Sequence, residues 1–142
     1  MFKFYRLRLA NKENQLKNNL TLTITSLLSI LLLTFHLTDD IVRGMEPGTL
    51  FDLIPVPILA VWLYGTVTLP EKRLGYVIVL LGSLLGLIVP FIHMKGTGVG
   101  GAIGKFPGSF FFIWTLYGLS VTPFFSGILA VRELWEHRRR PA

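Results

Sequence analysis

The strongest constraint on this chain is the way its basic residues alternate with long apolar runs. Four runs of 18 or more residues, at 20–37, 50–69, 74–93 and 109–131, contain almost no charge. A helix of about 18 residues is about 27 Å long, close to the roughly 30 Å thickness of the hydrocarbon core of a bilayer. The pattern therefore predicts four transmembrane helices.

The basic residues predict how these helices are oriented. Eleven of the 14 Lys and Arg residues lie in the segments 1–19, 70–73 and 132–142. Because short loops rich in Lys and Arg stay on the cytoplasmic side of a membrane, all three segments are expected inside. The prediction is an all-α, up-down four-helix bundle with both termini cytoplasmic, formed by a single membrane domain covering residues 1–142. A bacterial inner membrane is the expected location.

The net charge of +6 and the pI near 10 do not indicate nucleic-acid binding, because the topology pattern accounts for the charge. The expected partner of the basic segments is the anionic lipid bilayer. Residues 1–19 interleave basic with apolar side chains, so we expect either a stretch lying on the inner leaflet or a disordered tail. The absence of Cys excludes disulfides and Cys-ligated metals.

The connection between the third and fourth runs is rich in glycine and contains the spacing GxGxxG at Gly96, Gly98 and Gly101. No strand is expected before it, and Phe106 follows Lys105 where a phosphate-binding loop needs Ser or Thr. We therefore expect no nucleotide site. Whether this loop re-enters the membrane is left open.

Small residues recur at helical spacing and predict packing faces, because helices in a bilayer associate by close backbone approach. These residues are Gly82 and Gly86 on the third run, and Gly118, Thr122, Ser126 and Ala130 on the fourth. Trp62, in contrast, is expected to anchor the second run at a membrane interface.

Five ionisable residues are expected at the outer end of the bundle. His36 precedes Asp39 by three residues and Asp40 by four, so these three can share one face of a helix. Asp52 at the start of the second run and His93 at the end of the third reach the same membrane level in the predicted topology. The outer rim would therefore gather two imidazoles and three carboxylates.

Several chemistries fit such a rim, and the sequence does not choose among them. Histidines with carboxylates could bind zinc, iron or manganese, and His36 and His93 are the best candidate ligands. The same two histidines could hold a haem between helices. The imidazoles and carboxylates could instead form a proton-linked or substrate-binding site, or a solvated rim that caps helix ends.

No motif names a reaction, so the expected function is that of a small, non-enzymatic binding or accessory protein whose functional face is the outer rim. One alternative is a metal- or haem-dependent membrane enzyme that uses His36 and His93. Another is an oligomeric carrier of a small solute or lipid. A monomeric transporter is disfavoured because the central thirds of the four runs lack ionisable residues. The expected protein partners are a second copy of the chain or another membrane protein.

Overall fold

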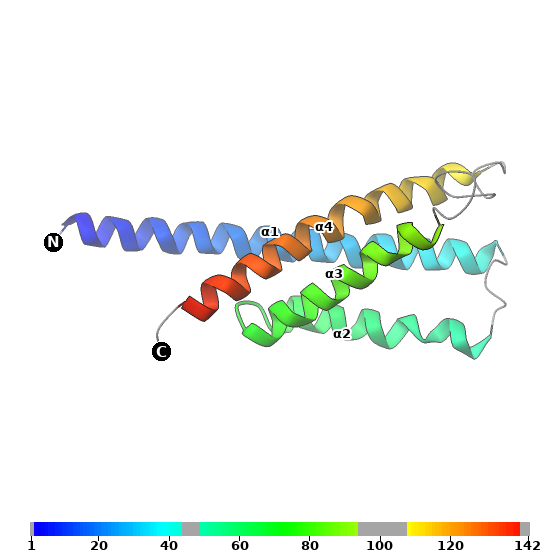
Figure 1. The fold of residues 1–142 in the computed structure, drawn as a ribbon, viewed down its shortest axis with the longest axis horizontal. Helices are drawn as coiled ribbons and strands as arrows, with labels where there is room; N and C mark the ends of the chain where they lie inside the picture. Colours follow the sequence, from blue (N-terminus) through cyan, green and yellow to red (C-terminus); the bar gives the residue numbers. More distant parts are fainter. Residues whose placement is uncertain (1, 44–48, 94–107, 140–142) are drawn as a thin grey trace.

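The chain folds into four α-helices and a short 3₁₀ helix in a computed structural model that describes residues 2–43, 49–93 and 108–139 (Figure 1). The elements are α1 (Phe2–Val42), η1 (Leu50–Leu53), α2 (Pro55–Thr68), α3 (Arg73–His93) and α4 (Ser109–Arg139). Consecutive helices run in alternating directions along the molecule. The described residues contain no strand, so the prediction of an all-α fold with four helices is confirmed.

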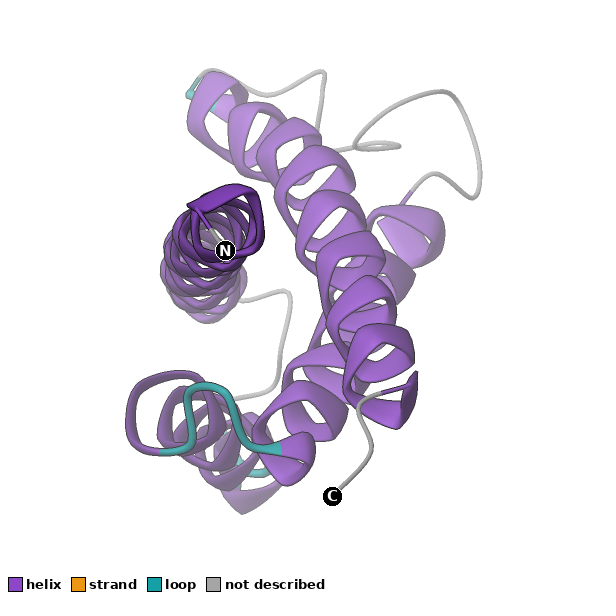
Figure 2. Ribbon diagram, turned by 90° about the vertical axis from the view of Figure 1, so that its left-hand side faces the viewer, coloured by secondary structure: helices purple, strands orange, loops and turns teal. Residues whose placement is uncertain are grey.

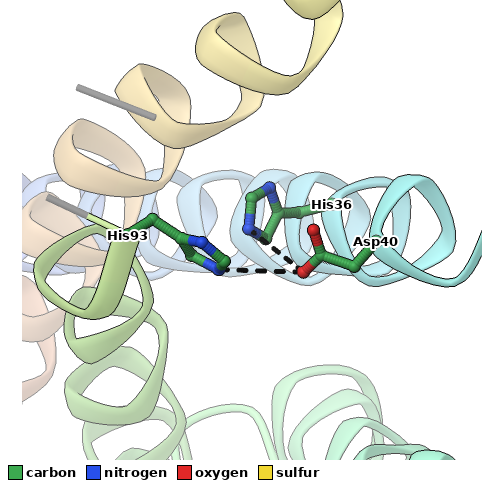
Figure 3. A group of neighbouring side chains, drawn as sticks. All are labelled: His36, Asp40 and His93. Carbon is green, nitrogen blue, oxygen red and sulfur yellow. Dashed lines mark ion pairs between the residues drawn. The ribbon is translucent and has the colours of Figure 1, made fainter. Parts of the chain in front are cut away.

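The alternating directions place two sets of helix ends at opposite ends of the molecule. The last turns of α1 and α3 and the first turns of α2 and α4 lie at one end, which we call the histidine end after His36 and His93 (Figures 1 and 3). The hairpin between α2 and α3 and the last turns of α4 lie at the other, which we call the arginine end after Arg73 and Arg138.

The longest helix, α1, has 41 residues and is therefore about 62 Å long. It contains no Gly or Pro, so no residue of that kind interrupts the helix between the basic segment and the apolar run. Its first turns extend past the ends of the other helices (Figure 1). Residues 2–19 are thus helical and continuous with the first apolar run, and are not a disordered tail.

The second apolar run forms a shorter helix than predicted. The 3₁₀ helix η1 occupies its start, and α2 then has 14 residues, about 21 Å. Pro55 begins α2, at a position where proline is favoured because the missing N–H would have no partner within the helix. Among the described helices, α1, α3 and α4 are long and apolar enough to cross a membrane, and α2 is below that length.

A tight turn joins α2 to α3. Lys72 N donates to Leu69 O at 3.3 Å, and Glu71 has a φ of 65°. A Cβ at Gly75 would lie 2.1 Å from Leu69 O, so only glycine permits this return of the backbone. The turn holds α3 directly beside α2.

The helices pack around α4, which crosses the bundle and contacts both α1 and α3, whereas α2 packs mainly on α3 (Figure 2). Val79 and Leu119 belong to the buried core. Large apolar side chains also cover the outside, and Leu85 and Phe125 are about half exposed. Outer faces of this kind suit contact with lipid or with another apolar partner.

Trp62 lies at the centre of the bundle, so the prediction that it anchors the chain at an interface is wrong. Its side chain is 1% exposed, and Nε1 donates to Ser26 Oγ at 2.9 Å. A Cβ at Gly82 would lie 2.2 Å from the indole ring. Because glycine faces the ring from α3, the whole indole fits between α2 and α3 and finds a hydrogen-bond acceptor on α1.

The other small residues predicted to pack also lie at helix contacts. A Cβ at Gly118 would meet Leu32 at 2.7 Å, and a Cβ at Gly86 would meet Pro123 at 3.0 Å. Ala130 is fully buried. Hydroxyl pairs join the helices as well: Ser26 with Thr66 at 2.8 Å, Ser29 with Thr122 at 3.1 Å, and Ser83 with Ser126. Polar contacts of this kind strengthen helix association where lipid is the solvent.

Candidate metal centre

Three side chains meet at the histidine end, and they point toward one another (Figure 3). His36 and Asp40 are one helical turn apart on α1, and His93 is the last residue of α3. Asp40 Oδ2 lies 3.6 Å from His36 Nε2 and 3.7 Å from His93 Nε2. The possible ligand atoms of the three residues all lie within 4.8 Å of one another. Two helices far apart in the sequence therefore bring two imidazoles to one carboxylate.

The cluster is enclosed rather than freely solvated. His36 is fully buried and Asp40 is 4% exposed, whereas the side chain of His93 keeps 22% of its surface. Phe112, in the first turn of α4, covers both imidazoles, with ring centroids 4.7 Å and 5.2 Å away. The two imidazoles meet edge to face at 4.8 Å. Access from outside is therefore on the side of His93.

Thr115 on α4 determines which nitrogen of His36 carries hydrogen. Its Oγ1 donates to the carbonyl oxygen of Phe112 at 2.8 Å and lies 3.1 Å from His36 Nδ1. Because a hydroxyl has one hydrogen to donate, Oγ1 accepts the hydrogen of Nδ1. Neutral His36 therefore carries its hydrogen on Nδ1 and presents the lone pair of Nε2 toward Asp40.

This lone pair faces a negatively charged group. His36 Nε2 is buried and has no hydrogen-bond partner among the described residues, and Asp40 Oδ2 is 3.6 Å away. A nitrogen lone pair and a carboxylate oxygen repel each other, and burial strengthens the repulsion. A cation between them, either a proton or a metal ion, turns the repulsion into attraction.

The donor set fits a divalent ion of the first transition row. Imidazole nitrogen and carboxylate oxygen bind zinc at about 2.0–2.2 Å, which puts two ligand atoms of a tetrahedral site about 3.3–3.6 Å apart. The two carboxylate-to-imidazole distances of 3.6 Å and 3.7 Å are close to this range, whereas the widest separation among the possible ligand atoms, 4.8 Å, must shorten by more than about 1 Å. The bond from His36 to Thr115 is the kind of outer contact that orients a metal-binding histidine. Three protein ligands leave a fourth position open.

A haem does not fit the same geometry. The macrocycle would have to lie between the Nε2 atoms of His36 and His93, close to Asp40 Oδ2. Phe112 packs on both imidazoles and closes the space beside them. A haem would require these four side chains to move apart, whereas a single ion requires the three donor atoms to move toward one another.

Of the other two predicted rim residues, Asp39 is not part of the cluster and pairs with Arg43 instead. Its Oδ2 accepts a hydrogen bond from Arg43 Nε at 2.6 Å, and Arg43 Nη2 donates to Gly108 O at 2.7 Å. Gly108 has a φ of 81°, which glycine adopts readily. Asp39 therefore helps to tie the end of α1 to the start of α4. The side chain of Asp52 lies outside the described residues.

Sequence reasoning missed Thr115 and Phe112. Hydroxyls in apolar helices usually bond the carbonyls of their own helix, and Thr115 does so as well. Phe112 and Thr115 are three residues apart, which puts both on one face of a helix, and this spacing is the only sign in the sequence that they act together. That this face meets His36 depends on how α4 packs against α1.

No protein-family model, no curated protein and no solved structure matches this chain.

Proposed function

We propose that this chain is a four-span membrane protein that binds one divalent transition-metal ion, most readily zinc, through His36, Asp40 and His93. The proposed orientation places both termini in the cytoplasm and the histidine end at the outer face of a bacterial inner membrane. The protein would act as a metal-binding accessory protein, in which a water or a donor from a partner fills the fourth position.

The lengths and surfaces of the helices support the membrane part of this proposal. Among the described helices, three are long and apolar enough to span, and α2 together with η1 and the turn between them covers the remaining apolar run from Leu50 to Thr68. The outer faces of the bundle carry large apolar side chains instead of the charged side chains that cover soluble bundles. The basic residues gather at the arginine end and in the first turns of α1, as cytoplasmic segments do.

The observation that carries the metal part is the orientation of His36. Thr115 occupies Nδ1, so the buried Nε2 lone pair points at the oxygen of Asp40 that also faces His93 Nε2. Three possible donor atoms thus lie close together, and the buried His36 Nε2 among them has no hydrogen-bond partner among the described residues. Two neutral imidazoles and one carboxylate leave a net charge of +1 on a bound Zn²⁺, which a site with one side open to solvent can tolerate.

Metal titration tests the proposal. The protein is purified in a mild detergent, stripped with a chelator and titrated with zinc in competition with a chromophoric chelator. We expect one zinc per chain. Asp40→Asn, which keeps the shape of the side chain, and His93→Ala should each weaken binding by about 100-fold or more, because each removes a ligand.

His137→Ala is the matched control. His137 is an exposed histidine near the arginine end, so its loss should leave zinc affinity unchanged. Helix content and monodispersity of every variant are measured alongside. Wild-type protein that binds no zinc at micromolar concentrations, or equal losses in His137→Ala and His93→Ala, would contradict the metal proposal. Reporter tags that place the two termini on opposite sides of the membrane would contradict the orientation.

A further inference from the structure

A groove opens between α3 and α4 at the arginine end, with a volume of about 310 Å³. Arg73 from the first turn of α3 and Arg138 from the last turn of α4 line its mouth, together with Trp135. Val77 and Leu80 form one wall, and Val131 and Leu134 form the other. The groove is therefore basic and aromatic at one end and aliphatic along its length.

The two arginines at the mouth form no ion pair with the described residues. Among the described residues, no carboxylate lies within 4.0 Å of either guanidinium, whereas the neighbouring Arg132 pairs with Glu136 at 3.0 Å. Glu133 is 2% exposed, so its carboxylate is not available at the groove surface. Two positive charges therefore line the same opening, and no carboxylate of the described residues neutralises them.

The aliphatic walls continue from these charges toward the middle of the bundle. Leu80 is seven residues from Arg73, and Val131 is seven residues from Arg138, which is about 10 Å along each helix. A ligand that fits must be anionic at one end and apolar for at least that length. Trp135, on which the Arg139 guanidinium stacks at 4.9 Å, stands where aromatic residues mark the boundary between lipid headgroups and acyl chains.

We propose that this groove binds one anionic phospholipid of the inner leaflet, with its phosphate between Arg73 and Arg138 and the first part of an acyl chain along Val77, Leu80, Val131 and Leu134. Arginine presents a planar set of donors that matches phosphate oxygens. The inference rests on the membrane orientation proposed above, which puts the arginine end at the cytoplasmic surface. It is independent of the metal site at the opposite end.

Native mass spectrometry of delipidated protein tests the proposal. The protein is titrated separately with dioleoyl phosphatidylglycerol and with dioleoyl phosphatidylcholine, and the fraction that retains one lipid is measured. We expect phosphatidylglycerol to bind about tenfold or more tightly than phosphatidylcholine. The double variant Arg73→Gln, Arg138→Gln should lose this preference, because each basic residue near a headgroup favours anionic lipid by a factor of about five.

Two further variants distinguish lipid binding in the groove from a general attraction between basic residues and anionic lipid. Arg132→Gln removes one charge of the same helix that is already paired, and it should keep the preference for phosphatidylglycerol. Leu80→Trp leaves both arginines but fills the aliphatic part of the groove, and it should weaken binding of phosphatidylglycerol. Equal binding of the two lipids by wild-type protein, an equal loss in Arg132→Gln, or full competition by glycerol phosphate would overturn the proposal.

The same samples are inserted into phosphatidylcholine vesicles and titrated with zinc. A double variant that inserts and binds zinc normally but has lost the lipid preference supports the lipid site specifically. Wild-type protein that inserts and binds zinc but shows no lipid preference overturns the lipid site alone, and leaves the proposed function standing.

Discussion

Thr115 Oγ1 accepts a hydrogen bond from His36 Nδ1 at 3.1 Å and so directs His36 Nε2 toward Asp40. This hydrogen bond joins α4 to α1. The orientation of His36 Nε2 therefore depends on how these two helices pack. Thr115 touches none of the three donor atoms that face the proposed ion. Its effect is exerted through the orientation and hydrogen position of one imidazole.

Replacing Thr115 by Val should therefore weaken zinc binding about 10- to 100-fold, because outer-shell contacts of metal-binding histidines contribute on that scale. Thr115→Ser keeps the hydroxyl and should retain most of the affinity. Zinc affinity by chelator competition gives the measurement. The role assigned to Thr115 is refuted if the Val and Ser variants bind zinc equally well.

The two adjacent carboxylates on α1 should behave differently. Asp39 is paired with Arg43, whereas Asp40 faces both histidines. We expect Asp39→Asn to change zinc affinity by less than about threefold and stability by about 0.2–1 kcal/mol, the usual range for an ion pair near a surface. Asp40→Asn should abolish tight zinc binding. The pair is compared by zinc titration and thermal unfolding, and similar zinc affinities for the two variants would show that the ligand has been misassigned.

Adding a methyl group at Gly82 should destabilise the bundle. The new Cβ would lie 2.2 Å from the Trp62 ring, which is itself fully enclosed. We expect Gly82→Ala to lower the free energy of unfolding by about 1–3 kcal/mol, as overpacking of a core does. Gly127→Ala is the control, because the nearest atom, Ser83 Cβ, is at an ordinary 3.6 Å. Unfolding in detergent measures both, and equal stability of the two variants would argue against the close approach of α2 and α3.

Removing the hydroxyl of Ser26 should destabilise the protein, because the buried N–H of Trp62 then loses its hydrogen-bond acceptor. Ser26 Oγ accepts this hydrogen at 2.9 Å in the centre of the bundle. We expect Ser26→Ala to lower the free energy of unfolding by about 1–2 kcal/mol. Thr34→Ala removes a hydroxyl that bonds a carbonyl of its own helix, Ile30 O, and should have a smaller effect. If thermal unfolding ranks the two variants in the opposite order, the indole hydrogen bond is not a source of stability.

The number of helices and their order could be predicted from the sequence, because the charge-free runs are long and the basic segments are short. The extent of α2 could not, because Pro55 and Pro57 are compatible with the start of a helix at several positions. The position of Trp62 was predicted wrongly for a related reason. From the sequence, an aromatic residue in an apolar run suits a membrane interface as well as a buried position. Only the packing of α2 on α3 shows that Gly82 leaves space for the indole ring.

The candidate site was predictable in part. The spacing of His36 and Asp40 and the antiparallel order of the helices were enough to bring His93 to the same end. The choice between Asp39 and Asp40 was not, because both lie on the same side of α1 as His36. That choice depends on Arg43, which holds Asp39 and reaches Gly108 across a gap of 65 residues in the chain.

The uninterrupted helix α1 has a mechanical consequence. It carries basic residues at one extremity and two of the three proposed zinc ligands near the other, with no glycine or proline between them. A helix of this kind transmits torsion, because turning it at one place turns every side chain along it. The first turns of α1 and the proposed metal site, about 45–50 Å apart along the helix, are therefore parts of one rigid rod.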